Sequence, residues 1–221
     1  DEASNNFLAS VVAEEGRMGL AFVDVSTGEF LTTEIDAERL TCELAKFRPA
    51  ECIAPFPLSW DAARLQILDE ANFSPDSTSA ALESRFGSGW AERLRLADKP
   101  LSARACGAII TYLHAAHFDA LGHLHDISFY SGSEFMVLDE VTLRNLEILK
   151  NIRDRSRRGT LLEFLSRTKT PMGARTLARW IQMPLLSLEA ITRRHCAIEE
   201  LSNNSVLRES LVEELKGACD L

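Results

Sequence analysis

The 221-residue sequence has no apolar run of about 18 residues, so it predicts no transmembrane helix. It also opens without a secretory signal peptide and contains no CxxC pair. Its cysteines are odd in number and widely spaced (Cys42, Cys52, Cys106, Cys196 and Cys219), which argues against a disulfide framework. We therefore expect a cytoplasmic protein whose thiols are reduced and mostly buried.

Disorder is not expected either, because charged residues (26%) are interspersed with hydrophobic ones (46%) in ordinary globular proportions. The chain begins at Asp1 rather than at a methionine, and residues 217–221 resemble the middle of a domain. We interpret the chain as an internal piece of a longer protein, long enough for one large domain or two small ones.

The net charge of −9 conceals a strong asymmetry along the chain. Residues 1–143 carry 10 basic and 23 acidic side chains, whereas residues 144–179 carry 10 basic and 3 acidic ones. The remaining residues carry 4 basic and 7 acidic side chains. The acidic first part would be repelled by a phosphate backbone, so only residues 144–179 are a candidate for facing nucleic acid.

The first third of the chain is rich in residues that favour β-strands. Strands are predicted over residues 7–12, 18–25 and 29–35, and Ser26-Thr27-Gly28 is a turn signal between the last two. Short links between consecutive strands favour an antiparallel meander. Another short strand is predicted at residues 51–54, before Pro55 and Pro57.

Helical periodicity follows the meander. A helix capped by Asp36 is predicted to run to about Phe47, and a second, capped by Ser59, is expected to carry Trp60, Ala63, Ile67 and Leu68. Residues 74–89 are predicted to form a loop with short helical turns, and residues 102–121 an amphipathic helix. Strands followed by alternating helices indicate an α/β domain with a mixed sheet over residues 1–125.

Residues 126–221 are predicted to be all-helical. Asp139 caps a helix running through Leu149, and Thr160 with Glu163 forms a capping box for residues 161–166. Thr170-Pro171 places a cap residue before a proline at the first helical position, which predicts a helix to about residue 183. Further helices are expected from Ser187 and from Ser205.

Two stretches of this helical segment are specific enough to indicate a family. The first is Leu138-Asp139-x-x-Thr142-x-Arg144-Asn145-Leu146-Glu147. The second is Gly159-Thr160-Leu161-Leu162, continued by Thr168-x-Thr170-Pro171-Met172-Gly173-x-Arg175-x-Leu177-x-x-Trp180-Ile181-x-x-Pro184-Leu185. Together they resemble the opening of the core domain of the MutS mismatch-repair family. Upstream, residues 6–9 and 24–30 resemble the start of the MutS connector domain.

The residues of these motifs are expected to have structural roles rather than catalytic ones. Gly173 is expected to let another backbone approach closely, and Leu177, Trp180 and Ile181 are expected to form one buried stripe. Asp139 and Thr142 fall in a first helical turn, where a carboxylate is favoured. The remaining polar residues, Arg144, Asn145 and Glu147, are expected to tie helices or domains together.

The resemblance implies an RNase H-like α/β connector at residues 1–125 and the first helices of the core at residues 126–221. It further implies a parent protein that binds mismatched DNA, hydrolyses ATP with magnesium, works as a homodimer and docks a MutL-type partner through the connector. The chain itself contains no Phe-x-Glu triplet and no phosphate-cradling G-x-x-x-x-G-K-[ST] motif. We therefore expect no catalytic, cofactor or metal site in this piece, whose role would be that of a link between the mismatch-binding and ATPase domains.

The connector surface that docks MutL in the family would lie just before Arg85-Phe86-Gly87. This chain has Ser79-Ala80-Ala81-Leu82-Glu83 there, instead of the polar pair of some relatives. The docking role is therefore expected of the domain and not of named residues.

Three alternatives to this interpretation remain open. An RNase H-like nuclease would use Asp24 as a metal ligand, with Glu43 or Asp119 as partners, although Asp24 also fits a turn. His114, His117, His123 and His125 could approach a zinc ion, although no further ligand is evident.

The third alternative concerns a basic run between two predicted helices. Its arginines, which are candidates for DNA-backbone or interdomain contact, are Arg153, Arg155, Arg157 and Arg158. We favour the interdomain or solvent role and expect negligible DNA affinity of this piece at physiological salt.

Overall fold

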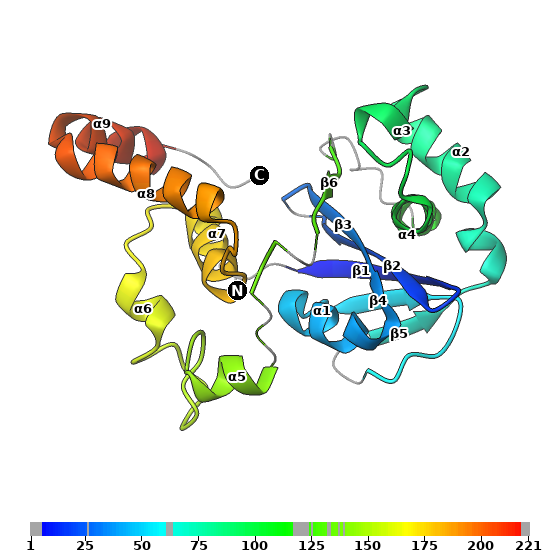
Figure 1. The fold of residues 1–221 in the computed structure, drawn as a ribbon, viewed down its shortest axis with the longest axis horizontal. Coiled ribbons are helices and arrows are strands. Elements are labelled where there is room, and N and C mark those ends of the chain that lie inside the picture. Colours follow the sequence, from blue (N-terminus) through cyan, green and yellow to red (C-terminus); the bar gives the residue numbers. More distant parts are fainter. Residues whose placement is uncertain are drawn as a thin grey trace. The chain divides into compact units, whose positions relative to one another are not determined.

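The structure is a computed structural model, and it describes residues 6–25, 27–60, 64–116, 124, 126–131, 134–136, 138 and 140–217. The chain forms two compact units, which we call the first unit (Asn6–Gly132) and the second unit (Ser133–Leu221) (Figure 1). No helix in the described ranges is both long and apolar enough to cross a membrane.

A mixed sheet organises the first unit. β1 (Phe7–Glu14), β2 (Arg17–Asp24) and β3 (Glu29–Asp36) form an antiparallel meander, as predicted. β4 (Glu51–Ala54) adds in parallel to β1, β5 (Arg64–Ile67) in parallel to β4, and β6 (Ser128–Phe129) in parallel to β3. The resulting order is β5-β4-β1-β2-β3-β6.

The turns of the meander follow the expected chemistry. Glu15 and Gly16 join β1 to β2 with φ of 47° and 81°, the positive values that a two-residue hairpin turn requires. Between β2 and β3, the N–H of Gly28 donates to the Asp24 carbonyl at 2.9 Å, with a φ of 74° that suits glycine. The predicted turn is therefore confirmed, although Ser26 lies outside the described residues.

The helix predicted after Ser59 is wrong where the structure describes it. Residues 64–67 form β5, whose backbone continues the sheet beyond β4 with Cys52 paired to Leu65 and Ala54 to Ile67. A short apolar stretch is compatible with both the helical and the strand periodicity. Residues 64–67 form a strand because the open edge of β4 offers backbone hydrogen-bond partners.

The loop predicted at residues 74–89 is also wrong, because α2 (Pro75–Phe86) occupies most of it. The Ser74 side chain accepts a hydrogen bond from the Ser77 N–H at 3.3 Å, and Pro75 occupies the first helical position. Thr78, Leu82 and Phe86 are buried at four-residue intervals. The helix is thus specified by its cap and by one buried face rather than by its overall composition.

Shorter helices complete the surroundings of the sheet. The turn after Asp36 is a 3-10 helix (Ala37–Arg39) without a side-chain cap, so α1 begins only at Leu40 and ends at Phe47. A second 3-10 helix (Glu70–Phe73) precedes α2, and α3 (Trp90–Arg93) follows it.

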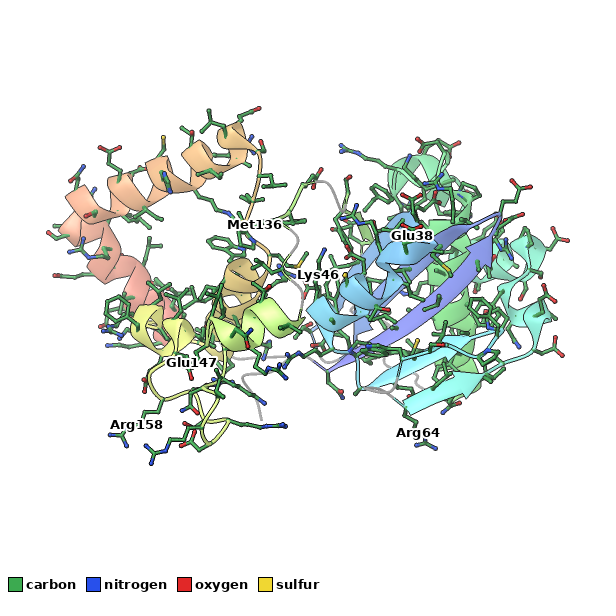
Figure 2. All side chains as sticks on the ribbon, turned by 60° about the horizontal axis from the view of Figure 1, so that its bottom comes forward. Glu38, Lys46, Arg64, Met136, Glu147 and Arg158 are labelled. Carbon is green, nitrogen blue, oxygen red and sulfur yellow. The ribbon has the colours of Figure 1, made fainter. Side chains whose placement is uncertain are left out.

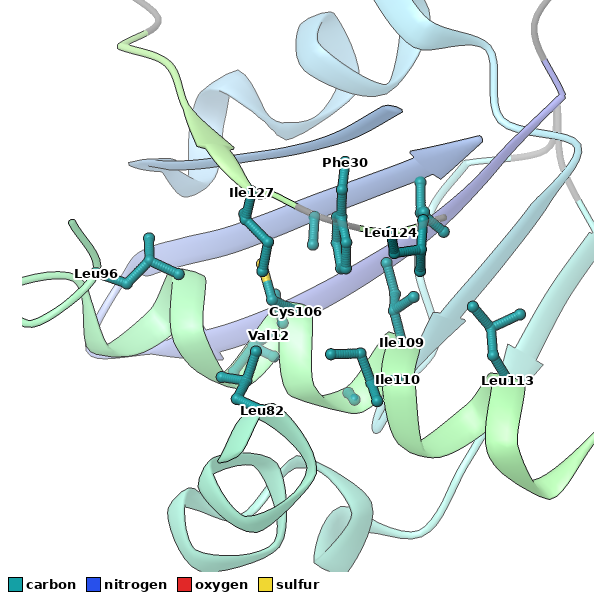
Figure 3. Close-up of a cluster of buried hydrophobic side chains, with 14 of the residues drawn as sticks. Val12, Phe30, Leu82, Leu96, Cys106, Ile109, Ile110, Leu113, Leu124 and Ile127 are labelled. Atoms are coloured by element: carbon teal, nitrogen blue, oxygen red, sulfur yellow. The ribbon is translucent and has the colours of Figure 1, made fainter. Parts of the chain in front are cut away.

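α4 (Pro100–Ala115) covers one face of the sheet and supplies the centre of the core (Figure 3). It begins earlier than predicted because Pro100 fits the first helical turn, while residues 117–121 of the predicted helix lie outside the description. The side chains of Ala105, Cys106, Ile109, Ile110 and Leu113 are buried, which gives the helix the apolar face of an amphipathic helix. They pack against strand residues such as Val12 and Phe30 and against Leu82 of α2.

The opposite face of the sheet carries α1. Phe22 of β2 stacks on Phe47 of α1 with ring centroids 4.1 Å apart, and Phe7 meets the same ring edge-on at 5.4 Å. Because neighbouring strand residues alternate between faces, Val23 instead joins the α4 side. The sheet is therefore buried on both faces.

The cysteines make a prediction about reactivity. Cys52 and Cys106 are buried, and burial raises the pKa of each thiol to about 12. Cys196 is exposed and Cys42 is partly accessible. Because the thiolate is the reactive form, iodoacetamide at pH 8 should label Cys196 before Cys42 and should spare Cys52 and Cys106 until urea unfolds the chain. Cys219 lies outside the described residues. Peptide mass spectrometry measures each site, and early labelling of Cys106 would contradict the described core.

The second unit is helical and has little buried surface in the described part. An antiparallel β-bridge pairs Phe135 with Leu185, next to a hydrogen bond from the Met136 N–H to the Pro184 carbonyl at 2.8 Å. The helices are α5 (Glu140–Asn145), α6 (Leu161–Leu165), α7 (Pro171–Gln182), α8 (Leu188–Asn203) and α9 (Ser205–Lys216).

Local capping signals located most of these helices. Thr170 accepts from the Gly173 N–H at 3.0 Å and Ser187 from the Ala190 N–H at 3.3 Å, as predicted. α9 begins at Ser205, as predicted, and Asn204 caps it by accepting from the Leu207 N–H at 3.0 Å. The helix predicted to reach Leu149 ends at Asn145, and Glu147 then adopts a left-handed φ of 47°.

The buried stripe predicted on α7 is wrong. Trp180 is 43% exposed, and neither Leu177 nor Ile181 is fully buried. α8 and α9 likewise bury no residue in the described structure. These helices show the amphipathic pattern of a core, but their apolar faces are open in this chain.

Candidate functional site

A charged cluster lies inside the first unit. The Lys46 ammonium contacts the Glu43 carboxylate at 2.6 Å, and both side chains are almost fully buried on α1. The Tyr130 hydroxyl, immediately after β6, donates to the other Glu43 oxygen at 3.2 Å. Burial, reinforced by the Glu43 carboxylate, raises the pKa of Tyr130 well above its usual value. Sequence reasoning missed this cluster, because Tyr130 is 87 residues from Glu43.

A hollow of about 450 Å³ lies at one end of the sheet. Glu51 at the start of β4 accepts hydrogen bonds from the Tyr112 hydroxyl at 3.0 Å and from the Gln66 amide at 2.5 Å. Asp24 lies at the end of β2, where one carboxylate oxygen accepts the Asn6 N–H at 3.2 Å. Burial and the bond to Glu51 raise the pKa of Tyr112. The carboxylates of the hollow thus hold protein groups in place.

The residues proposed for metal chemistry do not converge in the described structure. Glu43 is engaged by Lys46 and Tyr130, and Asp24 is buried at the sheet end. Asp119, His117, His123 and His125 lie outside the described residues. Among the residues that are described, no three His, Cys, Asp or Glu side chains are grouped so that they could hold a metal ion. The nuclease alternative therefore gains no support, whereas only His114 of the zinc alternative lies among the described residues.

The first family motif surrounds α5. Asp139 lies outside the described residues, whereas Arg144 and Asn145 are exposed and Thr142 is half-buried. Glu147 follows α5, and its carboxylate accepts the Ile152 N–H at 2.8 Å. Glu147 therefore organises the chain that follows it.

The second family motif begins α7. Thr170 caps the helix and Pro171 occupies its first position, while Arg175 is half-buried. The close approach expected at Gly173 involves side chains rather than another backbone: a Cβ there would lie 3.1 Å from the Thr170 hydroxyl and 3.5 Å from the Thr168 Cβ. Glycine thus leaves room for the cap.

The exposed Trp180 has a partner on the next helix. The Arg194 guanidinium of α8 lies 3.9 Å from the centre of the Trp180 ring, a cation–π contact between α7 and α8. Burial, together with the nearby Arg194 charge, lowers the pKa of Arg179. This basic and aromatic contact was not predicted, although Trp180 itself belongs to the family motif.

The basic run lies between α5 and α6, as predicted. All four arginines of this connection are exposed: Arg153, Arg155, Arg157 and Arg158. They belong to the only strongly basic part of the sequence, residues 144–179. These arginines are the candidate contact residues of the second unit.

Comparison with known proteins matches both units in the same order. The family model of MutS domain II matches residues 6–125, and that of MutS domain III matches residues 141–221. A DNA mismatch repair protein MutS from Methanothrix thermoacetophila is 49% identical over the whole chain. Proteins of the same name from Methanococcoides burtonii and Caldanaerobacter subterraneus subsp. tengcongensis are 38% and 36% identical over 94% and 100% of it.

The chain spans about a quarter of the length of these curated relatives. The domain II match alone covers more than half of the chain. The chain therefore belongs to the MutS family and carries sequence of its domains II and III.

Proposed function

We propose that the chain is a structural link within a mismatch-recognition ATPase of DNA repair. Residues 1–125 would be the connector domain and residues 126–221 the start of the helical core, joining the mismatch-binding and ATPase domains of the parent protein. The observation that carries this proposal is the match of domains II and III, in order, along one chain. The parent would bind mismatched duplex DNA, use ATP and magnesium, and act as a homodimer.

The sheet supports an RNase H-like assignment of the connector. A three-stranded antiparallel meander is extended from its first strand by two parallel strands, giving β3-β2-β1-β4-β5. Two carboxylates of this domain form structural contacts. Glu43 is paired with Lys46, and Glu51 accepts hydrogen bonds from Tyr112 and Gln66. The role assigned to the domain is therefore mechanical.

The connector would also offer a docking surface to a MutL-type protein. α2 presents an exposed face to solvent, including Ser79, Ala80 and Glu83, just before Arg85. Its other face is anchored in the core through Leu82 and Phe86. A rigid helix with a polar outer face is suited to partner recognition without any change in the core.

Capture of a MutL-type protein tests this proposal. The immobilised chain should retain the purified MutL-type protein of the same source, and Ala80→Arg should reduce retention at least tenfold by placing a long cation on the docking face. Thr41→Arg on the exposed part of α1 is the matched control and should bind like the original chain. Failure of the unmodified, folded chain to retain the partner at micromolar concentration would refute the docking role.

A further inference from the structure

The loop joining α5 to α6 is held by a network of hydrogen bonds although it is neither helix nor strand. We call residues 151–158 the arginine loop. The Asn151 N–H donates to the Ser156 carbonyl at 2.9 Å, and the Asn151 amide group donates to the Ser156 hydroxyl and to the Arg158 carbonyl, both at 3.0 Å. Arg155 adopts a left-handed φ of 58° within this loop. Such a network fixes the backbone from which the arginines project.

The nearby carboxylates accept hydrogen bonds from backbone N–H groups of the loop and its ends. Asp154 accepts the Ser156 N–H at 2.8 Å, and this bond, with others to Ser156 and Asn151, lowers the pKa of Asp154. Glu147 accepts the Ile152 N–H at 2.8 Å, and Glu163 accepts the Gly159 N–H at 2.6 Å. All three acidic residues of the basic segment 144–179 therefore stabilise the loop or its ends.

The guanidinium groups of Arg153, Arg155 and Arg158 remain available to a ligand. Arg153, Arg155 and Arg158 are exposed, and within the described ranges none of them forms an ion pair. Figure 2 shows Arg158 extending away from the ribbon. Next to the loop lies a hollow of about 430 Å³, which is lined by Arg157, Leu162, Glu163, Ser166 and Arg167 and by Ala174 and Ala178 of α7. Its one carboxylate, Glu163, is engaged by the Gly159 N–H.

We infer that the arginine loop and the adjoining hollow form a binding site for the phosphate backbone of duplex DNA. Arginine presents a planar fork of donors that matches phosphate oxygens, and contacts of this kind position a protein without reading sequence. The choice of DNA as the polyanion rests on the proposed function of the parent. The strongly acidic residues 1–143 oppose the interaction in this chain, so binding should be measurable at low salt and weak at physiological salt.

The first test removes the charges. Binding of the 221-residue chain to a fluorescently labelled, fully paired duplex is measured by anisotropy between about 20 and 100 mM NaCl, a range in which phosphate binding is salt-sensitive. The triple variant Arg153→Gln, Arg155→Gln, Arg158→Gln should bind at least about tenfold more weakly at the lowest salt. Its slope of log affinity against log salt should flatten by about 0.9 for each phosphate that is no longer neutralised. The control is Arg64→Gln, Arg95→Gln, Arg193→Gln, which removes the same charge from exposed arginines elsewhere and should weaken binding much less.

The second test keeps every charge. Asn151→Ala deletes the amide that holds the loop, so it should weaken binding several-fold while leaving the salt slope nearly unchanged. Circular dichroism confirms that each variant is folded. Equal affinity of the triple variant and its control, or no binding by the original chain at the lowest salt, would overturn the proposed site.

Two further readouts separate this inference from other outcomes. Arginine-dependent binding to polyglutamate, without binding to duplex DNA, would assign the loop to an acidic protein surface and overturn the DNA assignment. Retention of the MutL-type protein should be the same for the original chain and the triple variant. A failed docking role and a failed DNA site are therefore distinguishable.

Discussion

Glu43→Leu should destabilise the first unit by about 3–5 kcal/mol, because it leaves the buried Lys46 ammonium without its counter-charge. The two side chains are 0% and 1% exposed, respectively, and their charged atoms are 2.6 Å apart. The same change removes the acceptor of the Tyr130 hydroxyl, which lies in a buried position. Urea denaturation followed by circular dichroism should show a large fall in the midpoint of the first transition.

Two controls isolate the buried charge as the cause. The double variant Glu43→Leu, Lys46→Met replaces the ion pair by apolar side chains of similar size and should recover most of the stability. Glu189→Ala breaks an exposed pair with Arg193 on α8, where solvent weakens the attraction, and should change the midpoint little. If Glu43→Leu were as mild as Glu189→Ala, the pair would not be desolvated as described.

The cluster also bears on how the first unit holds its last strand. β6 is only two residues long, and Tyr130 follows it with a backbone hydrogen bond to the Thr32 carbonyl at 3.0 Å and a side-chain bond to Glu43. A two-residue strand alone has little surface to pack, so the buried hydroxyl and the adjacent Phe47 ring supply much of the anchoring. A mechanical role for the connector requires such a firm attachment where the chain leaves the sheet.

Local sequence signals were sufficient to predict an element wherever residues within that element determine its structure. The meander was predicted from alternation and turn residues, and α7 from Thr170 and Pro171, because these signals act within a few residues. β5 was mistaken for a helix because its identity depends on the edge of β4. α2 was mistaken for a loop because its Ser- and Ala-rich composition hides the buried face of Thr78, Leu82 and Phe86.

For the candidate sites too, some features could be predicted from the sequence and others could not. The positive charge of residues 144–179 is evident from the sequence, but the conformation of the arginine loop is not. That conformation depends on the Asn151 amide bonding Ser156 across a left-handed Arg155, which composition does not indicate. Glu43 was considered as a metal ligand for nuclease chemistry, because nothing local reveals that Tyr130 folds against it.

Gly107→Ala should destabilise the first unit by about 3 kcal/mol, although alanine is the better helix former by about 1 kcal/mol. A Cβ at Gly107 of α4 would lie 2.4 Å from the Thr78 Cβ, 2.5 Å from its carbonyl oxygen and 2.6 Å from its Cα. Two of these atoms belong to the backbone of α2, so no rotamer change relieves the overlap. Thr78→Ala, which retains the Cβ and the backbone, should therefore fail to rescue Gly107→Ala.

Gly19→Ala tests the same principle on the other side of α4, where a Cβ would lie 2.3 Å from the Leu101 carbonyl oxygen. Gly19→Ala should lower the urea midpoint about as much as Gly107→Ala does, because β2 and the start of α4 would have to separate. Gly217→Ala is the matched control: its new Cβ would lie 3.6 Å from the Glu214 carbonyl oxygen, an ordinary contact, and the midpoint should stay within experimental error. An unchanged midpoint for Gly107→Ala would mean that α2 and α4 can move apart at little energetic cost. A connector with such deformable packing could not serve as the proposed structural link.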